Sequence, residues 1–295
     1  MERRKSYYIG VMFSAVLMAG MMAGCTERDL SERPSDGMLR IEFEWPKDDN
    51  NNTVDVSGAH LWLYGSDGSL YLSTPADAGG YEARVPADTY TAIVINSDNV
   101  NTESHDEDAY STCRVEADLL ENYTDVLMNV DHVFCTGIGG ITVNRGNLPT
   151  VVTMYPENVV KYIHFRIDPT YIDDVESMEI RMSGIVPAVY TRDGNDTEEQ
   201  TLSVMAAAQS ESNGLYSADM SVFGWRGNNI ITATVRFTDG TEEETLPVDI
   251  SDQLDDLPEE GGTVDVILQL PDGGEIRLTA TVDTWGSGSG SGIVI

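Results

Sequence analysis

The chain has 295 residues, of which 50 are acidic and 17 are basic, and its formal net charge at pH 7 is −33. A protein this acidic is not suited to bind nucleic acid or to dock its surface on anionic lipid, because both carry charge of the same sign. The length allows two domains of roughly 100–150 residues each.

The N-terminus has the pattern of a bacterial lipoprotein signal. Residues 3–5 are basic, and residues 9–23 are apolar and uncharged. This stretch is shorter than the roughly 20 residues that span a bilayer, so it suits a signal sequence better than a membrane helix. Small residues lie directly before Cys25, as lipoprotein processing requires. We therefore expect residues 1–24 to be a signal peptide and Cys25 to carry the lipid, whose acyl chains give stable anchoring.

Polar residues dominate the segment 25–37, which is typical of a lipidated tether. Beyond it, Ile41, Phe43 and Trp45 alternate with polar residues, the period of two that predicts half-buried β-strands. Further strand-like segments follow at 59–64, 70–72, 81–85, 89–96, 139–145 and 151–155. The segment 118–130 is expected to include a short helix before another strand.

The second half repeats this character. Strand-like segments occur at 163–167, 178–182, 230–237, 264–270 and 276–282. One or two helical turns are expected at 251–259, with Ser251 as the cap. Many short strands at roughly 8–12-residue spacing predict β-sandwiches. With Pro149 and Pro156 as breaks, we expect an N-terminal sandwich at 38–148 and a C-terminal sandwich at 149–285.

The tail at 286–295 has a distinct composition. A flexible Gly/Ser run ends in the apolar triplet Ile293, Val294 and Ile295. The triplet is either a frayed end or an edge strand of its own sheet, which we favour, or a donor strand for another subunit.

Three cysteines occur, and lipidation of Cys25 would leave Cys113 and Cys135. In an oxidising compartment these two could form a disulfide, or they could be two separate buried thiols. Both alternatives stay open. The chain has no Cys-x-x-Cys pattern, so we expect neither a metal nor a redox site.

No catalytic constellation stands out, and we expect no enzyme activity and no cofactor. Glu103, Asp106, Glu107 and Asp108 surround His105, but they lack the spacing of a calcium loop and favour a solvated loop. The other histidines show no ligand spacing, and no phosphate loop or dinucleotide fingerprint appears; they are His60, His132 and His164.

Aromatic residues on one strand allow two interpretations. Trp62 and Tyr64 share the face opposite Leu61 and Leu63. Exposed, they could stack on sugar rings; otherwise they lie buried beneath a loop or the neighbouring domain. We favour burial.

Several segments together resemble the FimB-type fimbrial lipoproteins of Bacteroidales. Besides the lipid-bearing cysteine, the matching segments are 43–46, 58–64, 90–96, 156–160 and 182–185. The resemblance implies two tandem transthyretin-like (Ig-like Greek-key) β-sandwiches, an outer-membrane lipid anchor on the cell surface, and a role in type V pilus assembly and cell adhesion. It also implies other fimbrial subunits as partners.

In that family, stalk subunits lose an N-terminal strand to an arginine-specific protease. Here Arg33 precedes Pro34, which resists such cleavage, and Arg40 lies inside the first strand. Cleavage at Arg28, close to Cys25, would release the lipid and spare every strand. The pattern favours an anchor or accessory subunit.

The leading hypothesis is therefore an outer-membrane-anchored fimbrial subunit that acts by β-strand pairing. The alternative is a surface glycan-binding lipoprotein of a polysaccharide uptake system, with Trp62, Tyr64 or Trp225 as the platform. A secreted hydrolase is the least favoured.

Overall fold

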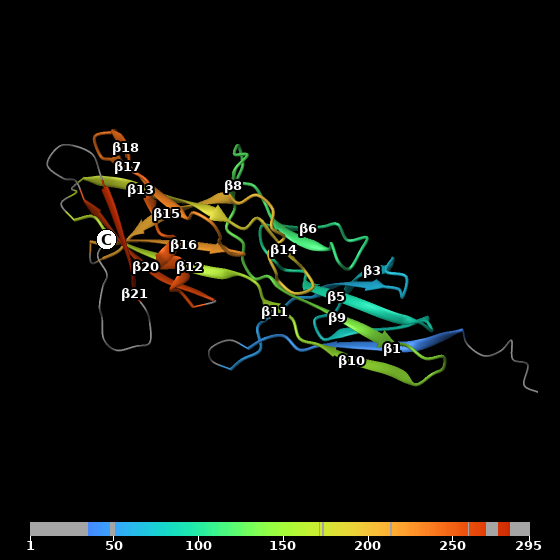
Figure 1. Cartoon of the computed structure of the whole chain (residues 1–295). Helices are drawn as coiled ribbons and strands as arrows, with labels where there is room; N and C mark the ends of the chain where they lie inside the picture. Colours follow the sequence, from blue (N-terminus) through green and yellow to red (C-terminus); the bar gives the residue numbers. More distant parts are fainter. Residues whose placement is uncertain are drawn as a thin grey trace, which may run out of the picture.

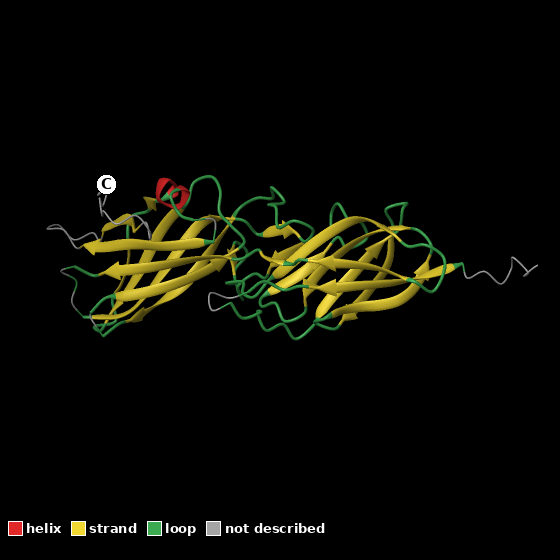
Figure 2. Cartoon of the chain, turned by 90° about the horizontal axis from the view of Figure 1, so that it is seen from below, coloured by secondary structure: helices red, strands yellow, loops and turns green. Residues whose placement is uncertain are grey.

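The computed structural model describes residues 35–47, 51–170, 172, 174–212, 214–258, 260–269 and 277–283. Two β-sandwich lobes lie end to end (Figures 1 and 2). The expected all-β architecture is confirmed. The predicted signal peptide, Cys25 and the terminal triplet lie outside the described residues.

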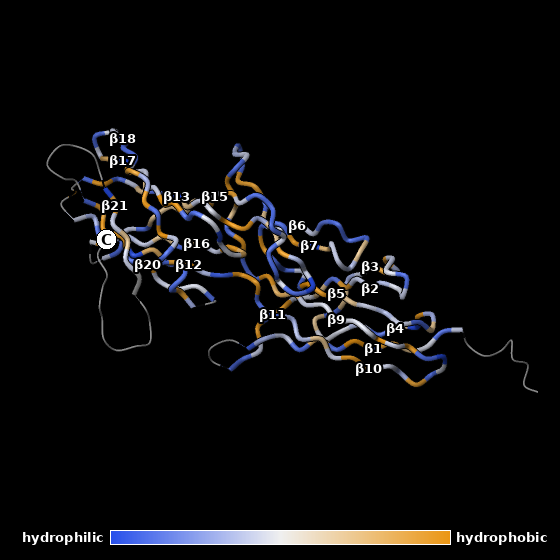
Figure 3. The backbone as a smooth tube through the Cα atoms, in the orientation of Figure 1, coloured by the Kyte–Doolittle hydropathy of each residue, from blue (hydrophilic) through white to orange (hydrophobic). Residues whose placement is uncertain are grey.

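The N-terminal lobe contains two facing sheets. One has the order β10 (Pro149–Met154), β1 (Asp36–Phe43) and β4 (Gly80–Pro86). The other has the order β11 (Glu157–Asn158), β9 (Phe134–Thr142), β5 (Thr89–Asn96), β2 (Ala59–Tyr64) and β3 (Leu70–Ala76). The core between the two sheets is formed by apolar residues, which alternate with polar ones along strands such as β1. In β1, Leu39, Ile41 and Phe43 point inward while Arg40 and Glu42 face solvent. The same alternation of apolar and polar residues is visible along the strands in Figure 3.

The C-terminal lobe is a sandwich whose strands follow one another in a single path. The order is β18 (Glu242–Glu244), β17 (Ile230–Phe237), β13 (Val175–Ile185), β15 (Leu202–Ser210), β16 (Tyr216–Val222), β12 (Lys161–Asp168), β20 (Gly261–Gln269) and β21 (Arg277–Asp283), with β19 (Val248–Asp249) on β17. Helix α2 covers Ser251–Asp255. The Ser251 side chain does not cap it, because its hydroxyl bonds Asp249 instead. No helix in the described ranges is long and apolar enough to cross a membrane.

A small sheet and a short strand join the lobes. The small sheet has the order β14 (Ala188–Tyr190), β7 (Arg114–Ala117) and β6 (Thr102–His105), so β14 from the second half pairs with β7 from the first. In return, β8 (Val126–Leu127) pairs with β15 of the C-terminal lobe. The segment 118–130, for which a helix was expected, contains turns and β8. One apolar cluster consequently runs from this junction into the C-terminal core.

The strand pairing also differs from the expected division at residue 149. Strand β10 pairs with β1, and β11 pairs with β9, so both belong to the N-terminal lobe. The lobes change after Asn158 rather than before Pro149. Proline at the first position of an edge strand removes no ladder hydrogen bond, so Pro149 starts a strand there instead of ending a domain.

Candidate partner-binding edge and junction cleft

Strand β10 forms one edge of the N-terminal lobe (Figure 1). It pairs in parallel with β1, from Met38 opposite Pro149 to Phe43 opposite Met154. On its other side no described strand pairs with it. Such an edge presents unpaired backbone N–H and C=O groups that another strand can complete.

The outer face of this edge is apolar. Val151 and Tyr155 are 51% and 59% exposed, and Leu148, directly before the strand, is 89% exposed. On the inner face Met154 is buried and Val152 packs against the N-terminal core. Residues 146–156 carry no charge, although the chain as a whole is strongly acidic.

Three other edges in the described part of the chain are blunted. Strand β4 carries Glu82 and Arg84, and β18 consists of three glutamates, Glu242–Glu244. Strand β3 is uncharged but contains Pro75, which cannot donate a ladder hydrogen bond. Charges and internal prolines are the usual protection of a sheet edge against a foreign strand. The apolar edge of β10 lacks both kinds of protection.

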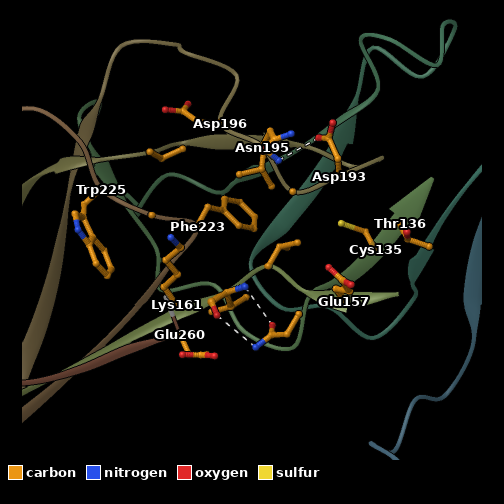
Figure 4. A pocket seen from close by; sticks show the side chains of 17 residues that line it. Cys135, Thr136, Glu157, Lys161, Asp193, Asn195, Asp196, Phe223, Trp225 and Glu260 are labelled. Atoms are coloured by element: carbon orange, nitrogen blue, oxygen red, sulfur yellow. Dashed lines mark hydrogen bonds between the residues drawn. The ribbon is translucent and has the colours of Figure 1, made fainter. Parts of the chain in front are cut away.

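A cleft of about 500 Å³ lies where the two lobes meet (Figure 4). Its lining comes from β9, β11, the start of β12, the turn after β14, the loop after β16 and the turn before β20. The residues labelled in Figure 4 are Cys135, Thr136, Glu157, Lys161, Asp193, Asn195, Asp196, Phe223, Trp225 and Glu260.

Of the three aromatic residues considered as a sugar platform, the structure leaves one in an accessible site. Trp62 is 2% exposed and Tyr64 is fully buried, both beneath the small sheet and its loops. The Trp62 indole Nε1 donates to Glu107 Oε2 at 3.0 Å. Trp225 is half-buried and lines the junction cleft.

Cys113 and Cys135 are both free and both buried, which corresponds to the second of the two alternatives. The Cys113 thiol lies 3.8 Å from Thr191 Oγ1, to which it donates. Burial raises the pKa of each thiol above its ordinary value. Neither thiol is therefore activated for nucleophilic chemistry.

Side chains of the acidic loop around His105 form ion pairs at the protein surface. The His105 Nε2 lies 3.8 Å from the carboxylates of Glu103 and Glu116, and Arg114 lies 3.3 Å from Asp106. Among the residues described, no group of three or more His, Cys, Asp or Glu side chains could hold a metal ion.

Sequence reasoning identified residues 151–155 as a strand but missed that the strand is an exposed edge. The uncharged run 146–156 in an acidic chain was the available signal. It also missed Lys161, Asn195 and Glu260 in the cleft, for which the sequence offers no signal because they come from separate segments.

The model of one protein family, described as a domain of unknown function (DUF5119), matches residues 24–205. A comparison with curated proteins found no match. Solved structures match over most of the chain.

A proposed adhesin from Bacteroides ovatus is 16% identical, with a TM-score of 0.64, covering 90% of this chain and 98% of that one. The fimbrial anchor protein Mfa2 from Porphyromonas gingivalis is 9% identical, with a TM-score of 0.56 and coverage of 84% and 97%. A proposed polysaccharide-binding protein (DUF1812) from Bacteroides thetaiotaomicron is 8% identical, with a TM-score of 0.58 and coverage of 84% and 96%. At these identities the likeness shows a shared fold, and at that level the resemblance to Bacteroidales fimbrial proteins is confirmed.

Proposed function

The chain belongs to the DUF5119 family, and from that premise we propose that it is an anchor or accessory subunit of a bacterial fimbria, active in pilus assembly and cell adhesion. The fold that it shares with a fimbrial anchor protein supports this role. In this role the protein is a structural subunit and not an enzyme.

The apolar edge of β10 is the observation that carries the proposal. An extended, uncharged segment of a neighbouring subunit would pair with the free side of β10 through its backbone, and its side chains would cover Val151 and Tyr155. Full burial of a large apolar side chain stabilises by about 1.5–3 kcal/mol, so covering two half-exposed ones contributes about 1 kcal/mol each. The backbone hydrogen bonds add to this gain.

A pull-down of polymerised fimbriae from the native strain tests the edge. Val151→Lys places a charge on the exposed face of β10, which is the device that natural edges use against pairing. The variant should fold normally by circular dichroism and retain about a tenth or less of the fimbriae that the unmodified protein retains. Leu246→Lys, at an apolar residue of similar exposure in the C-terminal lobe, is the matched control. Full retention by the β10 variant would refute pairing at this edge.

The lipid anchor is the second part of the proposal. Cys25 would carry the acyl chains that hold the protein in the outer membrane while other subunits polymerise. Replacing Cys25 with Ala should release the protein, and any attached fimbriae, into the medium. Continued membrane retention of that variant would overturn the anchor.

The terminal triplet Ile293, Val294 and Ile295, for which the sequence favours a frayed end or an edge strand of its own sheet, is the alternative candidate for a donor strand to the next subunit. If it is a donor, its deletion should abolish assembly beyond this subunit and leave membrane attachment unchanged. If assembly of the truncated protein is normal, the triplet is not a donor.

A further inference from the structure

The junction cleft has an apolar floor and a polar rim, the arrangement of a small-ligand site. Val160, Val189 and Phe223 line the cleft with at most 4% of their surface exposed. Phe223 and the indole of Trp225 are seen in Figure 4. The volume of about 500 Å³ falls within the roughly 300–1,000 Å³ of ligand clefts. Clefts between lobes are a common place for such sites.

The rim offers groups that are free to bind. Asp193 lies 3.2 Å from Arg192 Nε, and Asp196 lies 2.8 Å from Arg226 Nε, so these two carboxylates are already paired. Glu157, Lys161 and Glu260, by contrast, form no ion pair with any described residue. The exposed side-chain amide of Asn195 adds a donor and an acceptor beside them.

From this combination we propose that the cleft binds a neutral glycan. The indole of Trp225 can exchange its cation–π partner Lys161 for the C–H face of a sugar ring, and the carboxylates, the amide and the displaced ammonium can exchange hydrogen bonds with the sugar hydroxyls. This binding site is separate from the free side of β10, because no β10 residue lines the cleft.

The charged side chains on the rim of the cleft favour a neutral ligand over an anionic, cationic or purely apolar one. Two unpaired carboxylates against one ammonium, in a chain of net charge −33, repel uronic or sulfated glycans. A cationic ligand on the Trp225 ring would be repelled by the ammonium of Lys161, whose Nζ lies 5.4 Å from the ring centroid. A purely apolar ligand would strip water from Glu157 and Glu260 without replacing its hydrogen bonds. A neutral, hydroxyl-rich ring avoids the charge repulsion and keeps Glu157 and Glu260 hydrogen-bonded, and it displaces only the Lys161 cation–π contact.

Native affinity electrophoresis of the full chain tests the proposal. Gels would contain mannan or xylan as neutral glycans, polygalacturonate as an anionic one, or chitosan as a cationic one. We expect at least one neutral glycan to retard the protein. Trp225→Ala should weaken the apparent affinity about tenfold, consistent with the loss of one aromatic stacking contact. Tyr123→Ala, at an exposed tyrosine outside the cleft, should leave retardation unchanged.

A second variant covers the case in which Trp225→Ala fails to fold. Glu260→Gln keeps the shape of an exposed side chain and should also weaken binding. Three results would overturn the proposal: no retardation in either neutral gel, retardation only by polygalacturonate or chitosan, or equal retardation of the cleft variants and the unmodified protein. Fimbrial pull-down with the β10 variants is a separate readout, so failure of one proposal is distinguishable from failure of the other.

Discussion

Replacing Trp62 with alanine is expected to lower the free energy of unfolding by about 3–5 kcal/mol, because the indole is part of the core and not a sugar platform. Trp62 is 2% exposed and packs in the apolar cluster at the junction. A tryptophan buries about 150–250 Å², which at about 25 cal/mol per Å² corresponds to about 4–6 kcal/mol, an upper bound. The loss of about 3–5 kcal/mol expected from measured substitutions lies just below this upper bound.

A conservative variant separates packing from hydrogen bonding. Trp62→Phe keeps most of the apolar volume but removes the bond from Nε1 to Glu107. Glu107 is half-exposed, so its carboxylate can turn to water. The expected loss is therefore smaller, about 1–2 kcal/mol for one hydrogen bond and the volume difference.

Urea unfolding followed by circular dichroism measures both losses. Tyr123→Ala, at an exposed aromatic, serves as the control and should stay within about 0.5 kcal/mol of the unmodified protein. If Trp62→Ala costs less than about 1 kcal/mol, the burial of this strand face beneath the small sheet is wrong, and Trp62 returns as a candidate for binding.

Three further predictions follow from the N-terminal lobe. Gly80→Ala should cost more than about 2 kcal/mol, because φ is +137° and a Cβ would lie 2.1 Å from the Ile41 carbonyl oxygen. Asn96→Ala should cost about 2–4 kcal/mol, since this fully buried amide donates to the His132 carbonyl and accepts from the backbone N–H of Phe134. Burial lowers the pKa of His60, so the unfolded chain binds more protons and stability should fall as pH drops below about 6.5.

Matched variants check these outcomes by the same unfolding assay. Gly79→Ala should be nearly neutral, because a Cβ there meets no atom within 4 Å. Asn144→Ala, at an exposed asparagine, should likewise change little. For the histidine, His60→Gln should flatten the stability profile between pH 5 and 6.5 (roughly the range set by the ordinary histidine pKa). Equal losses of stability in the two glycine variants would contradict the backbone explanation, and equal losses in the two asparagine variants would contradict the hydrogen-bond explanation. An unchanged dependence of stability on pH in His60→Gln would contradict the role of His60.

Strand exchange between the lobes bears on the proposed role. Strand β14 of the second half completes the small sheet of the first, and β8 of the first half pairs with β15 of the second. A shared apolar cluster continues through this junction. Bending the lobes apart would break backbone pairs and expose that cluster, so the junction resists bending.

The sequence by itself determined the strands and much of the core. The alternation in β1 and β12 predicted which side chains point inward, because the side-chain period of a strand is two and a sandwich buries one face. The resemblance to fimbrial proteins likewise came from short local segments, and it held for the fold.

Only the tertiary structure decided which strands lie at edges and which residues meet across the junction. Val151 and Tyr155 belong to a segment that the sequence predicts as a strand, yet only the structure shows that they lie exposed on its outer face while Val152 and Met154 face the core. Burial of Trp62 was the favoured interpretation of its strand and is confirmed, but only the structure shows that a sheet built partly from residues of the second half covers it. Glu157, Trp225 and other cleft residues converge from segments far apart in the chain. Local periodicity carries no information on such long-range pairing, so edges and clefts are visible only once the sheets are assembled.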